Sequence, residues 1–293
     1  MIGQLSLSLD GRIRDKVEMS LDILRQFEPA EGYYLAFSGG KDSQCVYHLA
    51  KMAGVKFDAH YSVTSVDPPE LVRFIKTNYP DVKFEIPHDK DGKPITMWNL
   101  IPKRLMPPTK IVRYCCEALK ESHGKYRVTM TGVRKSESIN RKKNQGMVTV
   151  MSPGKKVVKQ IEETGAEFTK TDRGGLILNY DNDDSKNVVD LCYRTTKTLI
   201  NPIIEWDEED VWHFLNSNGI EHCCLYDEGS KRIGCIGCPM GTISHRIAEL
   251  ERWPKYKEGY KKAFKRMLEV RNERGVERDW NTPEEVFDWW LRE

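Results

Sequence analysis

The sequence predicts an α/β fold with a doubly wound, mostly parallel sheet and a helical C-terminal tail. Over the first half of the chain, segments with the two-residue periodicity of strands alternate with segments of helical periodicity. A glycine turn at residues 38–43 joins an apolar run directly to a helical pattern, as happens at the carboxyl edge of a parallel sheet. The 293 residues suffice for one large α/β domain or two small ones.

The elements follow in chain order. A helix is predicted over residues 13–27, where apolar residues recur every three or four positions until Pro29 and Gly32 end the pattern. Strands are predicted at 33–37, 57–63, 82–86 and 127–133, and helices at 44–50, from Pro68 onward, and at 111–123. Asp207 is placed to cap a further helix that ends at Gly219.

Residues 144–187 interrupt this alternation. They hold several glycines and short β-like runs, so we expect an insertion of hairpins or a flap. The resulting domain division is a nucleotide-binding α/β domain at 1–246 and a helical extension at 247–293. Aromatic and basic residues mix in the extension, which fits either contact with RNA or DNA or, more simply, a helix packed on the domain with its Lys and Arg stems along the surface.

The bulk composition excludes several classes of protein. The net charge of +2 creates no strong global field for nucleic acid, although basic residues cluster at 134–143 and 255–278. Neither a signal-peptide core nor an apolar run of membrane-spanning length is evident, so we expect a cytoplasmic protein without membrane contact. Eight cysteines in such a chain favour metal or redox chemistry over a disulfide framework.

The run 38–43, Ser-Gly-Gly-Lys-Asp-Ser, is the strongest functional signal. At the start of a helix, a phosphate can meet free backbone N–H groups and the positive end of the helix dipole. Gly39 and Gly40 allow close approach of the backbone, Ser38 and Ser43 add hydroxyls, and Lys41 adds charge. Asp42 can cap the helix or hold a metal. The plainer alternative is a tight turn without a ligand.

Two cysteine motifs indicate a metal site. Cys235 and Cys238 form a C-x-x-C in a glycine-rich turn, which alone fits zinc, an iron–sulfur cluster or a dithiol pair. Cys115 and Cys116 are adjacent at a predicted helix start, so their side chains diverge by about 100°. Such a pair suits the separated iron corners of a [4Fe–4S] cluster better than one zinc ion, and four thiolates complete the cluster.

These motifs resemble known families. S-G-G-x-D-S is similar to the pyrophosphate loop of the adenine nucleotide α-hydrolase superfamily. With C-C-x-x-x-K and C-x-x-C, the chain resembles the phosphoadenosine phosphosulfate (PAPS) reductase family, to which DNA-phosphorothioation-type ATP pyrophosphatases are related. The further matching segments are Gly132 to Ser138 with Arg141, Asn201 to Trp206 before Val211-Trp212, and Tyr226 to Gly229 before Gly234-Cys235.

The resemblance implies roles for particular residues. ATP, or an adenylylsulfate-type nucleotide, is expected at residues 38–43 and Gly132, with Mg²⁺ present and Lys41 and Asp42 among the catalytic groups. Arg134 and Arg141 are expected to meet its anionic groups, since Arg offers a permanently charged, bidentate fork; a solvated charged face is the alternative. Asp67 is expected to contact ribose or metal, or only to cap a turn.

The chain departs from the family in one respect. Sulfonucleotide reductases carry a catalytic cysteine in a C-terminal E-C-G-L-H segment, and no cysteine follows Cys238 here. We therefore expect ATP cleavage between the α- and β-phosphates, coupled to iron–sulfur-dependent sulfur transfer. The expected partners are a sulfur donor such as a cysteine desulfurase, a nucleic acid as sulfur acceptor, and a second copy in a homodimer.

Three alternatives stay open. The first is an adenylylsulfate or phosphoadenylylsulfate reductase with an atypical nucleophile. The second is a nucleotide-binding module without turnover, and the third is a zinc-stabilised nucleic-acid-binding protein. Cys223 and Cys224 form a second adjacent pair, which can replace Cys115 and Cys116 as ligands or carry sulfur.

Overall fold

The computed structural model describes residues 11–121, 123–124, 126–179, 183–192, 196–276 and 279–293. The chain forms two compact units, neither of them a continuous segment. Unit 1 comprises residues 1–61, 74–83 and 124–224, and unit 2 comprises residues 62–73, 84–123 and 225–293. The C-terminal helices, predicted as an extension beyond residue 246, thus belong to the same unit as residues 84–123.

The described strands form an eight-stranded sheet with the order β3-β2-β1-β4-β8-β5-β7-β6, which lies in unit 1 apart from Ser62 of β2 and residues 84–85 of β3. The strands are β1 (Tyr33–Ala36), β2 (Phe57–Ser62), β3 (Lys83–Glu85), β4 (Val128–Met130), β5 (Val148–Met151), β6 (Phe168–Lys170), β7 (Leu176–Leu178) and β8 (Lys197–Ile200). Strands β2, β1, β4 and β8 run parallel to one another. This parallel centre confirms the predicted fold class.

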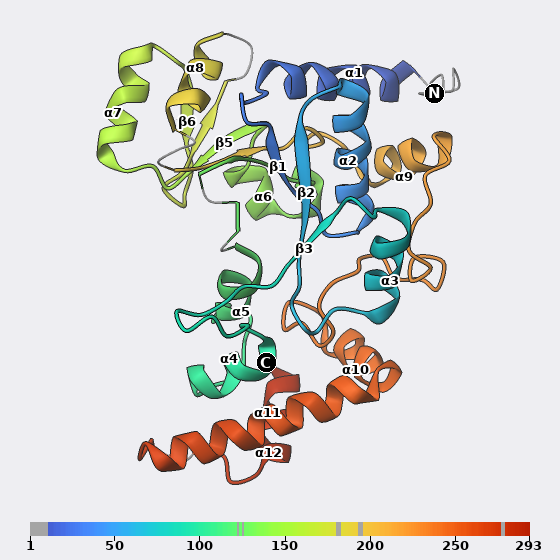
Figure 1. The fold of residues 1–293 in the computed structure, drawn as a ribbon, viewed down its shortest axis with the longest axis vertical. Helices are drawn as coiled ribbons and strands as arrows, with labels where there is room; N and C mark the ends of the chain where they lie inside the picture. Colours follow the sequence, from blue (N-terminus) through green and yellow to red (C-terminus); the bar gives the residue numbers. More distant parts are fainter. Residues whose placement is uncertain (1–10, 122, 125, 180–182, 193–195, 277–278) are drawn as a thin grey trace. The chain divides into compact units, whose positions relative to one another are not determined.

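The apolar run that predicted β1 is buried throughout the strand's first three residues. Tyr33 and Leu35 are fully buried and Tyr34 is 5% exposed, as expected for a central strand of a parallel sheet covered on both faces. Helix α2 (Lys41–Ala53) follows β1 and packs against α1 (Gly11–Gln26) and α9 (Glu208–Ser217) (Figure 1). The predicted cap of α9 is confirmed, because the Asp207 side chain accepts a hydrogen bond from the Asp210 N–H.

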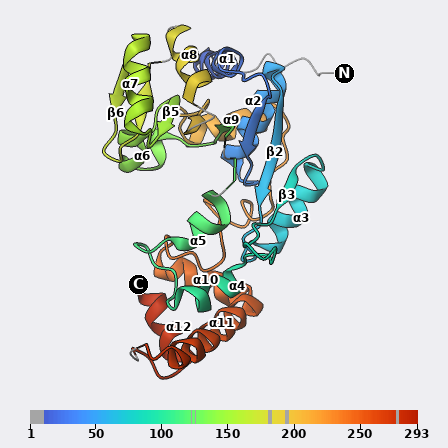
Figure 2. The same ribbon diagram turned by 60° about the vertical axis from the view of Figure 1, so that its left-hand side comes forward.

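The segment after residue 144 extends the sheet in the antiparallel sense. Strand β5 pairs antiparallel with β8 and β7, and β6 forms an antiparallel pair with β7. Two helices that the sequence did not predict, α7 (Lys155–Thr164) and α8 (Asp183–Cys192), lie in the same region and pack together (Figure 2). A short helix α6 (Ile139–Asn144) precedes β5 and packs on the 3-10 turn η2 (Lys135–Glu137).

Helix α3 (Pro69–Asn78) begins at Pro69, as predicted, and connects residues of both units. The predicted helix at 111–123 is shorter in the structure: α5 covers only Tyr114–Cys116 and continues as a π-helical turn at Glu117–Glu121. Residues before Tyr114 form a turn instead, in which the Thr109 N–H donates to the Val112 carbonyl.

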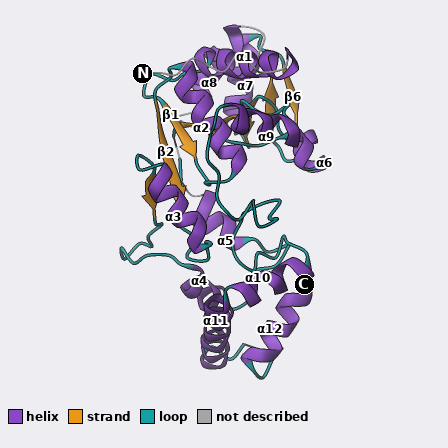
Figure 3. Ribbon diagram, turned by 90° about the vertical axis from the view of Figure 1, so that its right-hand side faces the viewer, coloured by secondary structure: helices purple, strands orange, loops and turns teal. Residues whose placement is uncertain are grey.

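Unit 2 is mainly helical (Figure 3). Its long helix α11 (Pro254–Glu273) packs against α4 (Met97–Arg104), α10 (Ile243–Arg252) and α12 (Pro283–Arg292). The core of this unit contains Tyr260, Phe264, Met267 and Trp290, none more than 1% exposed. The aromatic residues of the C-terminal segment thus face a packed core, the simpler of the two predictions. In the described part of the chain, no helix is both long and apolar enough to cross a membrane.

Candidate functional site

The predicted phosphate loop lies between β1 and α2 in unit 1. Gly39 has a φ of 72°, a left-handed conformation that favours glycine, and Gly40 is the N-cap of α2. The Ser43 hydroxyl donates to the Gly40 carbonyl at 2.8 Å and accepts from the Ser38 N–H at 3.2 Å. Gly40 makes no side-chain cap hydrogen bond to the first helical turn, and an uncapped helix N-terminus of this kind is a common binding site for anions.

Gly132 follows β4 and touches this first turn. A Cβ at Gly132 would lie 2.8 Å from the carbonyl carbon of Asp42 and 3.0 Å from the Ser43 nitrogen. A side chain at this position would therefore collide with backbone atoms that cannot rotate away. The close approach explains the glycine and brings the loop after β4 against the start of α2.

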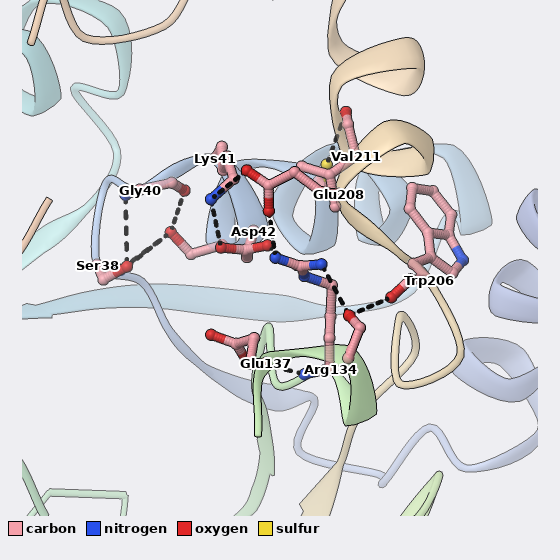
Figure 4. Close-up of polar contacts among 12 residues, drawn as sticks. Ser38, Gly40, Lys41, Asp42, Arg134, Glu137, Trp206, Glu208 and Val211 are labelled. Atoms are coloured by element: carbon pink, nitrogen blue, oxygen red, sulfur yellow. Dashed lines mark hydrogen bonds and ion pairs between the residues drawn. The ribbon is translucent and has the colours of Figure 1, made fainter. Parts of the chain in front are cut away.

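Four charged side chains interlock beside the loop. Figure 4 shows the Arg134 guanidinium between the carboxylates of Asp42 and Glu208. Arg134 donates to Asp42 Oδ1 at 2.6 Å and to Glu208 Oε2 at 2.9 Å. The Lys41 ammonium lies 3.3 Å from Glu208 Oε1 and 3.5 Å from Asp42 Oδ2. Lys41 and Arg134 are each only 3% exposed, so two buried cations are held by two carboxylates.

Glu208 is the member of this group that the sequence analysis missed. It occupies the first turn of α9, directly after the cap Asp207, and its side chain is 53% exposed. Partial burial alone would raise its pKa, but the charges of Lys41 and Arg134 outweigh that effect and lower the pKa. The one sequence signal was an acidic first turn, which is ordinarily explained by the helix dipole.

Arg141 is one contact removed from the interlocked charges. It forms an ion pair with Glu137, whose carboxylate also accepts the Arg134 N–H at 3.1 Å. Arg134 itself is further fixed by Ser136, whose hydroxyl lies 3.0 Å from Nη1 and donates to the Trp206 carbonyl at 3.1 Å. The structure thus gives Arg134 a direct contact with the loop helix and gives Arg141 an indirect one.

Asp67 belongs to unit 2, where its carboxylate closes a turn. It accepts from the Thr64 N–H at 2.8 Å and from the Thr64 hydroxyl at 2.7 Å, and it is 8% exposed. The Thr64 hydroxyl in turn lies 3.5 Å from the Cys235 sulfur. These contacts are those of the turn-capping role, the second of the two roles predicted for Asp67.

All four cysteines of the predicted cluster belong to unit 2, and their sulfurs influence one another. The Cys115 thiol donates a hydrogen bond to Cys116, which raises the pKa of Cys115 and lowers that of Cys116. Cys235 and Cys238 raise the pKa of Cys115 further. In the structure as it stands, no three His, Cys, Asp or Glu side chains among the described residues gather closely enough to hold one metal ion.

Basic groups accompany these thiols. Arg113 Nη2 lies 3.5 Å from the Cys116 sulfur, and Cys235 raises the pKa of Lys120, an exposed residue of the π-helical turn. The sequence motif contained Lys120, but no role was predicted for it. Positive charge beside thiols favours their thiolate form, which is the form that binds metals.

The turn between Cys235 and Cys238 is fixed by Gly237. Its φ is 71°, and a Cβ there would lie 2.9 Å from the Trp290 ring. Its N–H donates to Glu249 at 2.9 Å, and the Tyr260 hydroxyl donates to the neighbouring Ile236 carbonyl at 2.9 Å. The C-x-x-C turn is therefore packed against the core of unit 2.

The second adjacent pair lies in unit 1. Cys223 is fully buried and Cys224 is exposed. Cys115 and Cys116, by contrast, belong to the same unit as Cys235 and Cys238.

Comparison with known proteins accounts for this set of features. The model of the phosphoadenosine phosphosulfate reductase domain matches residues 32–240. The chain belongs to this family. The match runs from β1 through the C-x-x-C turn, so it includes the phosphate loop, Gly132, Arg134, Glu208 and all four cysteines of unit 2, and it confirms the family that the sequence motifs indicated.

Individual relatives are more distant. The chain is 26% identical over 285 residues to an uncharacterized protein of Methanocaldococcus jannaschii, which covers 92% of this chain but only 56% of that protein. It is 20% identical over 255 residues to the adenosine 5′-phosphosulfate reductase of Shouchella clausii, covering 80% of this chain and 83% of the enzyme. A solved structure, the PAPS reductase of Candida auris in a phosphate complex, aligns with a TM-score of 0.43, 14% identity, and coverage of 78% and 97%.

Proposed function

We propose that the chain is an ATP pyrophosphatase of the PAPS reductase family, which cleaves ATP between the α- and β-phosphates in an iron–sulfur-dependent sulfur transfer. The observation that carries the nucleotide part is the glycine-capped first turn of α2, with buried Lys41 and Arg134 beside it. A helix N-terminus without a side-chain cap, with cations beside it, suits a polyphosphate better than any other common ligand.

Each charged side chain beside the phosphate loop has a proposed role in this reaction. The first turn of α2 would bind phosphate oxygens, and Lys41 would exchange its contact with half-exposed Glu208 for one with the nucleotide. Arg134, held by Asp42 and Ser136, would fix the position of the loop helix and lend its charge to the leaving pyrophosphate. Asp42 would hold a Mg²⁺ that accompanies the nucleotide and neutralises phosphate charge.

The sulfur-transfer part follows from the four cysteines of unit 2. These four thiols belong to one unit and influence one another electrostatically, and their number matches the four thiolates that a [4Fe–4S] cluster takes at its separate corners. Arg113 and Lys120 would offset the negative charge of the thiolates. The cluster would take part in the transfer of sulfur. A zinc ion is the alternative metal for this site.

The order of steps is set by leaving-group chemistry. An oxygen of the acceptor would attack the α-phosphate and release pyrophosphate. The terminal sulfur of a donor persulfide would then displace AMP from the adenylated acceptor, and a thiol reductant would cleave the resulting disulfide to release the donor. A cysteine desulfurase is a donor of the required kind, and a nucleic acid is the proposed acceptor. Residues 239–293 contain no cysteine, so an S-sulfo intermediate of a reductase reaction would have to form on a thiol elsewhere.

The proposal is tested with ATP in anaerobically prepared protein. With ATP we expect AMP and pyrophosphate once an acceptor is present, and calorimetric binding of ATP even without one. Lys41→Met should abolish tight binding, whereas the control Lys51→Met, on the exposed side of the same helix, should not. Equal ATP affinity in wild type and Lys41→Met would contradict the proposal.

A reductase with a relocated nucleophile is the second candidate, and the exposed thiol of Cys224 favours it. Phosphoadenylylsulfate, thioredoxin and a thiol reductant would then yield sulfite at a catalytic rate, and this activity would be lost in Cys224→Ser.

The cluster has a test of its own. A change to Ser at any one of Cys115, Cys116, Cys235 and Cys238 should lower the iron content of the protein, while Cys223→Ser and Cys224→Ser should not. Stoichiometric zinc in place of iron would reject the cluster.

A further inference from the structure

Arg246 is a buried cation in unit 2 that the proposed reaction does not use. It lies on α10, is fully buried, and its guanidinium carbon is 4.5 Å from the centre of the Trp290 ring. Its Nη2 donates to the Trp290 carbonyl at 2.7 Å and its Nη1 to the Leu291 carbonyl at 3.2 Å. Both acceptors belong to the last turn of α12, where the helix dipole supplies a partial negative charge.

No carboxylate forms an ion pair with this cation. Within the described ranges no ion pair joins Arg246 to Asp or Glu, and its Nε is buried without a hydrogen-bond partner. The Glu249 carboxylate, on the same helix, acts on Arg246 electrostatically, but it is shared with the Gly237 N–H at 2.9 Å and with His245 at 3.2 Å, and burial raises its pKa. A buried cation without a full counter-charge is costly, so an anion is expected close by.

The Cys235–Cys238 turn lies beside this cation. A Cβ at Gly241 would lie 3.3 Å from the Cys238 carbonyl oxygen and 3.5 Å from Arg246 Cγ, so the arginine stem and the turn are close neighbours. Burial lowers the pKa of Arg246, and Tyr260, Cys238 and Glu249 act in the opposite direction when they are charged. The cation is therefore buried next to the turn that carries two of the four predicted ligands.

We propose that Arg246 is the internal counter-charge of the group held by Cys115, Cys116, Cys235 and Cys238, and a positioning residue for it. This inference rests on the proposed function. Four thiolates around a [4Fe–4S] core carry net negative charge, which grows when the cluster accepts an electron. A buried cation therefore favours retention of the cluster and favours its reduced form. Arg246 lies outside the matched family segment, residues 32–240, so this counter-charge comes from the C-terminal helices of this chain.

The experiment measures the midpoint potential of the cluster, which a merely structural arginine would not move. Wild type, Arg246→Met and Arg246→Lys are reconstituted anaerobically with iron and sulfide and titrated with dithionite under visible and EPR detection. The matched control is Arg271→Met, since Arg271 is also a buried arginine over a tryptophan, Trp280, but is paired with the Asp279 carboxylate. If Arg246→Met does not fold, Arg246→Gln replaces it, because a neutral amide can still donate to the Trp290 carbonyl.

We expect the neutral variants to shift the potential to more negative values and to lose iron faster to a chelator. Arg246→Lys should lie near wild type, and Arg271→Met should leave the potential unchanged even where it lowers the melting temperature. A loaded Arg246→Met or Arg246→Gln with the wild-type potential would overturn this inference and leave the proposed function intact. Wild type that binds no iron under these conditions would overturn both.

Discussion

Gly132 and Asp42, ninety positions apart in the sequence, are in backbone contact at the phosphate loop. A Cβ on Gly132 would lie 2.8 Å from the carbonyl carbon of Asp42. The loop after β4 thereby reaches the first turn of α2, and Arg134, two residues further on, can donate to the Asp42 carboxylate. The contact makes the glycine a requirement of the site.

Gly132→Ala should therefore push the loop away from α2. The added methyl group meets backbone atoms, and overpacking of this kind costs about 1–3 kcal/mol. We expect a lower free energy of unfolding by denaturant and a weaker calorimetric affinity for ATP. The matched control is Gly154→Ala in the same unit, because a Cβ there meets nothing within 4 Å. Equal behaviour of the two variants would show that the close approach is unimportant.

Glu208 should compete with nucleotide phosphate for the cations of the loop. In Glu208→Gln the amide cannot balance Lys41 and Arg134, so the loop becomes more attractive to an anion. Since the carboxylate is half exposed, its ion pairs are worth about 0.2–1 kcal/mol, and we expect ATP affinity to rise by a factor of roughly 1.4 to 5. Calorimetry at constant salt measures this. The exposed Glu209→Gln is the control, and a fall in affinity specific to Glu208→Gln would mean that Glu208 positions Lys41 productively.

The parts of the fold that follow from local signals were predictable. The Asp207 cap and the glycine turn at residues 38–43 each depend on a few adjacent residues, and both are in place. Prediction from short sequence patterns failed where one residue type has two structural roles. The glycines of residues 144–187 predict the turns of a hairpin insertion or a flap, whereas two of them, Gly154 and Gly165, cap the two ends of α7, the second with a φ of 75°.

The sequence predicted individual residues of the candidate site but not the contacts that bring them together. The sequence identified Lys41, Asp42 and Arg134, but Glu208 joins them through a contact across the fold that no local pattern encodes. The predicted helix at 111–123 failed for a similar reason. Its apolar pattern is helical, yet Ile111 is 90% exposed and Val112 lies in a turn closed by Thr109, so burial does not support helix there.

Gly237→Ala should disrupt the cysteine turn of unit 2. An alanine at a φ of 71° is strained by about 1–2 kcal/mol, and its Cβ would also lie 2.9 Å from the Trp290 ring. We expect a lower melting temperature together with a lower iron content after anaerobic reconstitution. Gly275→Ala separates the two causes, because that glycine has a φ of 64° but open space around it. If both variants retain iron equally well, contact with Trp290 does not shape the turn.

His48 predicts how the stability of unit 1 depends on pH. Burial, with help from the Lys51 charge, lowers the pKa of His48 to about 4, below the ordinary value of 6.5. The folded state therefore disfavours the protonated ring. The full contribution is present above about pH 6.5, and stability falls as the pH drops from there toward 4.

His48→Gln should remove this contribution to the pH dependence while the amide can still meet the Tyr79 hydroxyl, which lies 3.2 Å from the His48 ring nitrogen. Denaturant unfolding at pH 7 and pH 4.5 measures it. In wild type the loss attributable to His48 should be at most about 3 kcal/mol, from 1.36 kcal/mol for each unit of pKa shift. The variant should lose less stability than wild type between the two pH values. A slope that is the same in wild type and His48→Gln would mean that His48 is readily protonated in the folded chain.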